Sequence, residues 1–283
     1  MTLPFSKVLC IEDFDHLLKY MQAMFPFAVQ DGQVIPHEYH RKWWEAAMAL
    51  RSMTELGALH PGARVLGMGA GQEPLVFFLT AFAEVHATDL YADGKSWAHS
   101  APPAMLLDPQ PPDHPPLRER YDRRRLIVQH MDGRDLRYPD NTFDATFSSS
   151  SIEHVEGELP GIAQAAAELG RVLKPGGILT LATEFRLDPP GNGWPGTFVF
   201  LPETIQEWLV EPSGCEWVDT PDYACSKATR ATEQTLDHAL YQGGWPHVVI
   251  NYQDCIFTSV FITLRKPGGK ADGEGQRTRK GKR

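Results

Sequence analysis

Two glycines and a carboxylate stand where a parallel sheet would place them to bind an adenosine-like ligand. The segment RVLGMGAGQEP at 64–74 reads as a short buried strand, a glycine turn and the start of a helix. Gly69 and Gly71 let the backbone approach a ligand where a Cβ would collide. Asp89 ends the next apolar run twenty residues later, where a carboxylate accepts hydrogen bonds from ribose hydroxyls. This pattern suits a dinucleotide and S-adenosylmethionine equally well.

The turn lacks the third glycine of a dinucleotide fingerprint. In the G-x-G-x-x-G pattern that position falls on Gln72 or on Pro74, depending on which glycine is counted first. Glu73 adds a negative charge at the start of the helix, which favours the helix dipole but repels a pyrophosphate. S-adenosylmethionine has no phosphate and carries an ammonium and a sulfonium, so the electrostatics favour it over a dinucleotide.

The elements that must position these residues alternate between strand and helix. Apolar runs predict strands at 64–68, 84–90, 125–133, 143–151 and 177–185, with a longer alternating strand at 255–266 and a short one at 215–219. Helical patterns cover 14–24, 37–57 with Gly57 as its C-cap, 73–82, 159–173 and 201–210. Such regular alternation predicts an α/β fold with a doubly wound parallel sheet, in which the last strand is antiparallel at or near an edge.

The chain divides into three parts by composition. Residues 1–35 are expected to form an N-terminal helical segment and residues 36–264 the main domain, followed by a basic, Gly-rich, disordered tail at 265–283. Within the main domain, residues 101–116 hold seven prolines. We expect this insertion to be an extended loop that contains no helix.

Charge and cysteine content narrow the class of protein. Of 27 basic and 36 acidic residues, the tail holds 8 and 2, so residues 1–264 carry a net charge of −15 and present a poor surface for nucleic acid. The four cysteines form no C-x-x-C pair, which argues against a zinc cluster or a disulfide scaffold. The N-terminus lacks the pattern of a signal peptide, and the most apolar run, 74–83, is too short to span a membrane. We therefore expect a soluble, cytoplasmic protein.

Four segments in order resemble the class I S-adenosylmethionine-dependent methyltransferases, in particular those of methyltransferase type 11. They are RVLGMGAGQEP, EVHATDL, QHMDGRDLRYPDNTFDATFSSSSIEHV and ELGRVLKPGGILTLATEF. The resemblance covers about residues 36–264. It implies a Rossmann-like, mostly parallel seven-stranded sheet with an antiparallel strand near one edge, and S-adenosyl-L-methionine as the cofactor.

The resemblance also assigns cofactor contacts. It places Gly69, Ala70 and Gly71 under the methionine and ribose, Asp89 and Leu90 at the ribose diol, Asp132 and Gly133 beside the adenine, and Ser149 near the methionine end. Two positions depart from the family pattern, since Gly67 replaces an acidic residue and Glu73 replaces the third glycine. Glu73 either restores the lost carboxylate from the other side of the turn or serves only the helix dipole.

Methyl transfer to a hydroxyl needs a base in addition to in-line positioning of the reactants. His154, just after the fourth predicted strand, is the candidate catalytic base, because imidazole titrates near neutral pH. The alternative is a structural or exposed histidine. Glu153, His154 and Glu156 are too divergent in direction to bind a metal, so no metal site is expected.

The expected acceptor is a small organic molecule or a carbohydrate, methylated on oxygen. Candidate contacts are Tyr39, Trp43 and Trp44, the insertion, and the loop at 187–200, although a tryptophan pair with aliphatic residues at helical spacing also suits a core. Gly67 and Glu73 leave open a non-catalytic binding or regulatory protein with the methyltransferase fold. An NAD-type oxidoreductase fits only the first two motifs.

Overall fold

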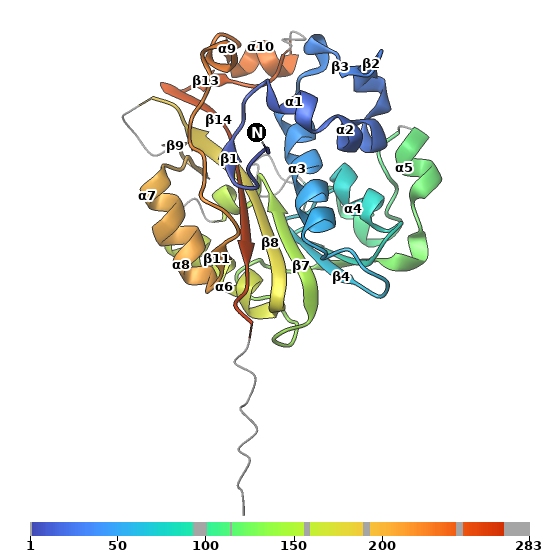
Figure 1. The fold of residues 1–283 in the computed structure, drawn as a ribbon. Helices are drawn as coiled ribbons and strands as arrows, with labels where there is room; N and C mark the ends of the chain where they lie inside the picture. The colour runs from blue at the N-terminus through green and yellow to red at the C-terminus, as the bar shows by residue number, and fades with distance from the viewer. Residues whose placement is uncertain are drawn as a thin grey trace, which may run out of the picture.

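The computed structural model describes residues 2–92, 101–113, 115–155, 159–188, 193–241 and 246–268. In this part of the chain, one ten-stranded sheet runs through the centre of the molecule (Figure 1), with the main order β12-β13-β14-β8-β7-β4-β5-β6. The seven longer strands are β4 (Arg64–Met68), β5 (Glu84–Asp89), β6 (Leu126–His130), β7 (Phe143–Ser149), β8 (Leu173–Arg186), β13 (Ile250–Tyr252) and β14 (Cys255–Arg265). The two-residue strands are β1 (Lys7–Val8), β11 (Glu216–Trp217) and β12 (Gln234–Thr235).

The strand directions confirm the predicted doubly wound architecture. Strands β4 to β8 pair in parallel, and β14 is antiparallel to β8 along nine residue pairs. On its other side, within the described ranges, β14 pairs only with β1, β11 and β13, none of which is longer than three residues. The long strand near the C-terminus therefore lies near the edge of the sheet and antiparallel to its neighbour, as its alternating pattern predicted.

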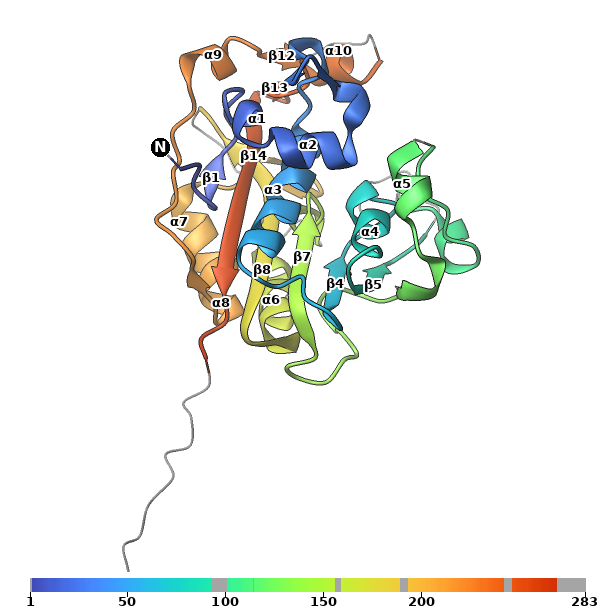
Figure 2. The ribbon, with the colours of Figure 1, turned by 45° about the vertical axis from the view of Figure 1, so that its right-hand side comes forward.

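Helices cover both faces of the sheet. In Figure 2, α3 (Arg41–Glu55) lies in front of β7, β8 and β14, and α6 (Leu159–Val172) lies behind them. Adjacent residues of β4 belong to different cores: Val65 packs in the cluster with α3 and α4 (Pro74–Leu79), and Leu66 packs in the cluster with α6. Because helices cover both faces, most residues of β4, β5, β7 and β8 are buried, including polar ones such as Thr88 and Thr146.

The N-terminal segment is joined to the sheet. It contains the expected helices α1 (Asp13–His16) and α2 (Leu18–Met24), the turn η1 (Pro26–Ala28), and a hairpin of β2 (Val29–Gln30) and β3 (Gln33–Val34). Its strand β1 pairs with β14. Residues 1–35 are thus more than a helical segment, since part of this stretch belongs to the main sheet. The turn η2 (Pro36–Glu38) then leads to α3, and Gly57 follows it in the left-handed conformation predicted for a C-cap.

The prediction that the Pro-rich insertion contains no helix is wrong. Residues Pro103–Leu106 form the 3-10 turn η4, and the last two prolines begin α5 (Pro115–Arg120). Proline lacks only an N–H that the first helical turn does not use, and its fixed φ suits that position, so prolines can start a helix that they could not continue. The loop predicted at 187–200 likewise contains a hairpin of β9 (Gly193–Trp194) and β10 (Thr197–Phe198).

The remaining elements complete the two ends of the sheet. The helix predicted at 201–210 consists of α7 (Pro202–Ile205), the π-helical turn η7 (Gln206–Val210) and α8 (Glu211–Ser213). The others are η5 (Arg123–Arg125), η6 (Ile152–His154), α9 (Lys227–Arg230) and α10 (Leu236–Tyr241). None of the helices in the described ranges is long and apolar enough to cross a membrane.

The predicted disordered tail begins too early. Arg265 is the last residue of β14, and Lys266 Nζ donates to the carbonyl oxygen of Leu173 at 2.7 Å, so both residues are ordered against the domain. The rest of the predicted tail, from residue 269 onward, lies outside the described residues.

Candidate functional site

The glycine turn follows β4 at the carboxyl end of the parallel strands. Gly69 and Gly71 both have positive φ, at 60° and 45°. A Cβ on Gly69 would overlap the hydroxyl of Ser151, which follows β7, so only glycine fits this position. The N–H of Ala70 donates to the carbonyl of Thr88 at 3.0 Å, which fixes the turn against β5. The predicted turn residues therefore form a rigid backbone surface without side chains at its two bends.

Asp89 is fixed beside this turn. Its Oδ2 accepts from the N–H of Gly71 at 2.9 Å, and its Oδ1 accepts from the N–H of Leu90 at 2.7 Å. Burial raises the pKa of the carboxyl, while these backbone donors oppose the shift. Each carboxylate oxygen retains a further acceptor site, which is what a vicinal ribose diol requires. The turn and Asp89 thus fit an adenosine group of the kind that the sequence predicted.

Asp132 and Gly133 follow β6 at the same edge. Arg134 binds the Asp132 carboxylate, with Nη2 to Oδ2 at 2.6 Å, and holds its pKa below the usual range. Gly133 packs against Met68, whose sulfur would lie 2.6 Å from a Cβ at this position. Asp132 remains an anion, and any adenine amino group that it binds must share the carboxylate with Arg134.

The structure explains the glycine at position 67. A Cβ there would lie 2.6 Å from Cζ of Phe147 and 3.0 Å from Cβ of Ala70. The ring of Phe147 fills the space that any larger side chain of residue 67 would need. A carboxylate at position 67 is therefore excluded by the way that β4 and β7 pack around Phe147.

Glu73 is the N-cap residue of α4, but its side chain makes no capping hydrogen bond. Burial raises its pKa to about 7; Lys42 and Arg41 oppose this shift and Glu45 adds to it. At neutral pH the carboxyl of Glu73 is therefore close to its midpoint of titration, and the charges that act on it belong to α3. Both alternatives for Glu73, the restored carboxylate and the charge at the helix N-terminus, stay predictions.

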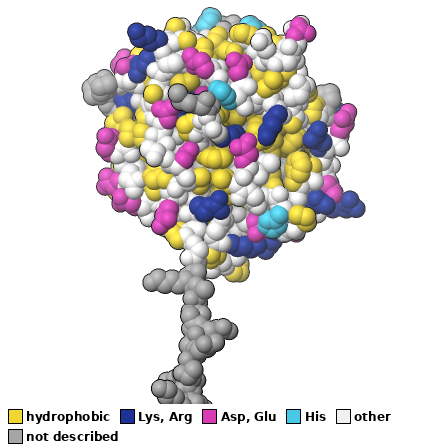
Figure 3. Space-filling model, viewed as in Figure 1, with side chains coloured by type: hydrophobic (Ala, Val, Ile, Leu, Met, Phe, Trp, Pro, Cys, Tyr) yellow, Lys and Arg dark blue, Asp and Glu magenta, His cyan; other side chains and the backbone are white. Residues whose placement is uncertain are grey.

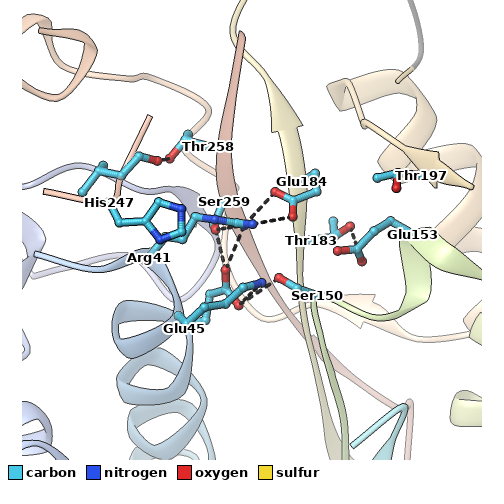
Figure 4. Close-up of polar contacts among 12 residues, drawn as sticks. Arg41, Glu45, Ser150, Glu153, Thr183, Glu184, Thr197, His247, Thr258 and Ser259 are labelled. Atoms are coloured by element: carbon cyan, nitrogen blue, oxygen red, sulfur yellow. Dashed lines mark hydrogen bonds and ion pairs between the residues drawn. The ribbon is translucent and has the colours of Figure 1, made fainter. Parts of the chain in front are cut away.

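A buried polar cluster lies next to the turn, and sequence reasoning missed most of it. Arg41 binds Glu184 through two hydrogen bonds of 2.7 and 2.8 Å, and all of these groups are buried (Figure 4). Glu45 accepts from Ser149 at 3.2 Å and from Ser150 at 2.9 Å. We call this set the Arg41 network: Arg41, Glu45, Ser149, Ser150, Glu184 and Ser259.

The Arg41 network occupies the hydroxyl of Ser149, which was predicted to lie near the methionine end of the cofactor. Two signals in the sequence point to the network. Arg41 and Glu45 share one helical stripe with Met48 and Ser52, which are buried, so two charges lie on the core side of α3. Glu184 is the one charged residue in the strand predicted at 177–185.

His154, the candidate base, ends η6 with its imidazole largely buried. Nδ1 lies 3.0 Å from the carbonyl oxygen of Gly196 and 3.1 Å from Oγ1 of Thr197. Because a carbonyl can only accept, Nδ1 carries the proton and Nε2 carries the lone pair. Burial lowers the pKa of His154, so the ring is neutral and able to accept a proton at neutral pH.

Glu153 lies directly beside this imidazole. Its side chain is fully buried, and Oε2 accepts from Oγ1 of Thr183 at 3.0 Å (Figure 4). Oε1 has no hydrogen-bond partner and lies 4.0 Å from Nε2 of His154. Burial, with a further contribution from Glu184, raises the pKa of Glu153 to about 8. Sequence reasoning considered this residue only as a metal ligand, and no group of three ligating side chains occurs within the described ranges.

The predicted aromatic acceptor contacts are mainly packing residues. Trp44 is fully buried, donates from Nε1 to Asp13 at 3.1 Å and lies edge-on to Phe261, so its assignment to an acceptor site is wrong and its place is in the core. Tyr39 stacks on Phe14 with ring centroids 4.5 Å apart, and Trp43 stacks on Phe25 at 5.5 Å. The adjacent tryptophans, with aliphatic residues at helical spacing, are a pattern that is also typical of a buried core.

The Pro-rich insertion does reach the site. Nε2 of Gln72, in the glycine turn, donates to the carbonyl oxygen of Gln110 at 2.7 Å. Ala101, at the other end of the described insertion, lies 3.9 Å from the Cβ position that Gly71 lacks. The insertion thus borders the cofactor side of the candidate site.

Comparison with known proteins finds similarity over part of the chain. Residues 65–181 match the family model described as "Methyltransferase domain". A 27-O-demethylrifamycin SV methyltransferase from Amycolatopsis mediterranei (strain S699) is 30% identical over 136 residues, which are 48% of this chain and 43% of that protein. The aligned stretch therefore spans less than half the length of this curated relative.

Solved structures share the fold at low identity. The [4+2]-cyclase SpnF is 21% identical with a TM-score of 0.51, covering 91% of this chain and 95% of that one. The YcgJ protein from Bacillus subtilis is 15% identical with a TM-score of 0.51, covering 78% and 99%. Geranyl diphosphate C-methyltransferase from Streptomyces coelicolor A3(2) is 17% identical with the same score, covering 78% and 79%.

The sheet order, the glycine turn and the family match agree. Residues 65–181 match a methyltransferase domain, and the described part of the chain shares its Rossmann-like fold with these solved structures.

Proposed function

We propose that the protein is an S-adenosylmethionine-dependent methyltransferase that methylates a hydroxyl group of a small organic or carbohydrate acceptor. The observation that carries the proposal is the unit of Gly71 and Asp89, in which a side-chain-free turn and a carboxylate with spare acceptor sites are hydrogen-bonded together. Its position after β4 and β5, inside the matched domain, supports the cofactor assignment. When bound, the cofactor supplies an electrophilic methyl group on a sulfonium.

The residues of this chain have separate tasks in the proposal. Gly69, Ala70 and Gly71 hold the cofactor by their backbone, and Asp89 and Leu90 bind its ribose. Asp132 and Gly133 flank the adenine. Ser149 and Glu73 lie at the methionine end of the cofactor. Ser149 is held there by its hydrogen bond to Glu45, and Glu73 interacts electrostatically with Lys42. His154 removes the acceptor proton through Nε2, and the relative from Amycolatopsis, named for methylation at an oxygen, supports an O-methyl product.

The experiment follows the methyl group. The full chain is incubated with labelled S-adenosylmethionine and a cell extract that has been separated into sugar, lipid, small-metabolite and nucleic-acid fractions. We expect label in the sugar or small-metabolite fraction and saturable binding of S-adenosylhomocysteine by calorimetry. Absence of both label and binding would refute the proposal. Label in the nucleic-acid fraction would refute the acceptor class, which rests on an acidic body and on a surface whose basic side chains are scattered among acidic ones (Figure 3).

A non-catalytic protein with this fold is the second candidate, because Gly67 lacks the usual carboxylate and because the fold is shared with a protein named as a cyclase. The same experiment separates the two. Binding of S-adenosylhomocysteine without transfer of label to any fraction favours the second candidate. For the first candidate, the methyltransferase, we propose a cytoplasmic location.

A further inference from the structure

One buried oxygen beside His154 has no role in the hydrogen bonding of the described residues. Oε1 of Glu153 is buried and unpartnered, whereas Oε2 of the same carboxyl is held by Thr183. An unsatisfied buried polar atom costs free energy comparable to a lost hydrogen bond, so a group in this state calls for a ligand that completes it. Figure 4 shows the Glu153 carboxyl on the side of β8 where Thr183 and Thr197 lie.

Burial raises the pKa of Glu153 and keeps its carboxyl protonated at neutral pH, and the charges around it do not reverse this. Glu184 on β8 disfavours a second negative charge, and Arg41 is already bound by Glu184. Lys42 on α3 opposes the shift but is not enough to reverse it, and His154 is itself neutral. At neutral pH the carboxyl of Glu153 therefore presents an O–H donor, while Nε2 of His154 presents a lone pair.

The spacing of these two groups fits a single bridging atom. Nε2 and Oε1 are 4.0 Å apart, which is too long for a direct hydrogen bond. Two hydrogen bonds of about 2.8 Å that meet at one oxygen, at an angle between about 90° and the tetrahedral angle, span roughly 4 to 4.6 Å. A hydroxyl oxygen placed between them donates a hydrogen bond to Nε2 of His154 and accepts a hydrogen bond from the O–H of Glu153.

We propose that Glu153 is a second contact of the acceptor oxygen, which it orients as a neutral hydrogen-bond donor, and that the Glu153–His154 pair thereby selects hydroxyl over amine acceptors. The inference rests on the proposed function. It assigns all four directions of the oxygen: one bears the carbon substituent, one holds the proton facing His154, and one lone pair faces Glu153. The remaining lone pair points at the methyl group.

The reaction balances with these assignments. The free lone pair of the acceptor oxygen forms the new C–O bond as the C–S bond breaks, and that electron pair stays on sulfur, which becomes neutral. The hydroxyl proton moves to Nε2 of His154, and Glu153 keeps its own proton. A neutral amine has one lone pair, which it needs for the attack, so it leaves the donor of Glu153 unsatisfied in the same position.

The test compares two variants of one buried side chain. Glu153→Gln keeps the size and a neutral donor, and Glu153→Leu keeps the approximate size without any donor. Turnover is measured with labelled S-adenosylmethionine and the extract fraction that the unmodified protein labels, and binding of S-adenosylhomocysteine is measured for each variant. We expect the Gln variant to keep kcat within about threefold and the Leu variant to lose about 100-fold, which is the usual effect of removing one positioned donor. Both should bind S-adenosylhomocysteine within twofold of the unmodified protein.

The pH profile supplies a readout that a merely structural role would not move. In the unmodified protein kcat should fall above about pH 8, where Glu153 ionises and loses its donor, and this fall should disappear in Glu153→Gln. A Gln variant as inactive as the Leu variant would overturn the inference, because it would show that a carboxylate is required. Full activity of the Leu variant would also overturn it, as would an N-methyl product. No transfer by the unmodified protein would instead overturn the proposed function, and the inference with it.

Discussion

The glycine turn at 69–71 and the Arg41 network lie at the same edge of the sheet, but they are assembled differently. The turn with Asp89 uses backbone groups and residues within about twenty positions of one another, and its hydrogen bonds are to main-chain N–H groups. The network joins Arg41 to Glu184 and Ser259, which are 143 and 218 residues away, entirely through side chains. The first is built from neighbouring segments of the chain, whereas the second depends on segments far apart in the sequence.

The difference also appears in the electrostatics. The turn needs one carboxylate that keeps spare acceptor sites beside a ligand, whereas the network buries two carboxylates with Arg41 and places a third, Glu153, next to them. Such buried groups are tolerated only when each is paired or neutral. Changes at the turn should therefore affect ligand binding first, and changes in the network should affect stability first.

The largest effect is expected on breaking the network. Glu184→Ala leaves Arg41 buried without its bidentate partner and should lower the free energy of unfolding by about 3–5 kcal/mol. Urea denaturation measures the change. The control is Asp188→Ala, which removes a half-exposed ion pair with Arg230 and should cost less than about 1 kcal/mol. An equal loss of unfolding free energy in the two variants would show that the buried ion pair contributes no more to stability than the surface ion pair.

Asp89→Ala tests the turn. Loss of the ribose contacts and of the bond to the Gly71 N–H should weaken binding of S-adenosylhomocysteine at least about 100-fold, because hydrogen bonds to a charged group are worth about 1.5–3 kcal/mol each. Calorimetric titration measures the affinity. Asp135→Ala, which removes an exposed carboxylate paired with Arg137, is the matched control and should bind normally. Undiminished affinity in Asp89→Ala would exclude this residue from the cofactor site.

The third prediction concerns the pH dependence of stability at Glu153. Its pKa is raised from 4.5 to about 8 on folding, so the folded protein binds a proton that the unfolded chain releases, and stability falls as pH rises between these values. Glu153→Gln removes this loss. Relative to the unmodified protein, the variant should gain on the order of 2 kcal/mol or more between pH 5 and pH 8 in urea denaturation.

Glu168→Gln is the control, because the pH dependence of stability at Glu168 has the opposite sign. Arg171 holds the pKa of Glu168 below its usual value, so its contribution is present above the unfolded pKa and is lost as pH falls. Parallel pH profiles for Glu153→Gln and the unmodified protein would mean that Glu153 is ionised in the fold.

The smallest effect is expected at Gly67. Gly67→Ala forces a methyl group against the ring of Phe147 and should cost about 1–3 kcal/mol through overpacking, again measured by urea denaturation. In a Phe147→Leu background the ring is gone, so the same change should cost clearly less. If the two costs are the same, Phe147 is not the reason for glycine at this position.

The sequence predicted the elements whose signals are local. The strand at 64–68 has the predicted bounds, and α3 and α6 differ from the predicted helices by a few residues, since apolar periodicity and Gly57 define them directly. The insertion was misjudged because its prolines were counted without regard to their place in a turn. Proline at the first helical position is compatible with α5.

The candidate site divides in the same way. Gly69, Gly71 and Asp89 were predictable, because each follows a recognisable strand and parallel strands end at one edge. The Arg41 network was not, since it depends on the register that places Ser259 opposite Glu184 across β14 and β8. No pattern in either strand alone specifies that pairing.

The contact between Gly69 and Ser151 links the two regions mechanically. Because the bend at Gly69 leaves no space for even a methyl group before the Ser151 hydroxyl, the turn cannot tilt toward β7 without displacing the segment that begins η6 and carries His154. A shift of the turn toward β7 would therefore also press on the segment that carries the imidazole of His154. Under the proposed function, we expect the cofactor and the acceptor to bind in a preferred order.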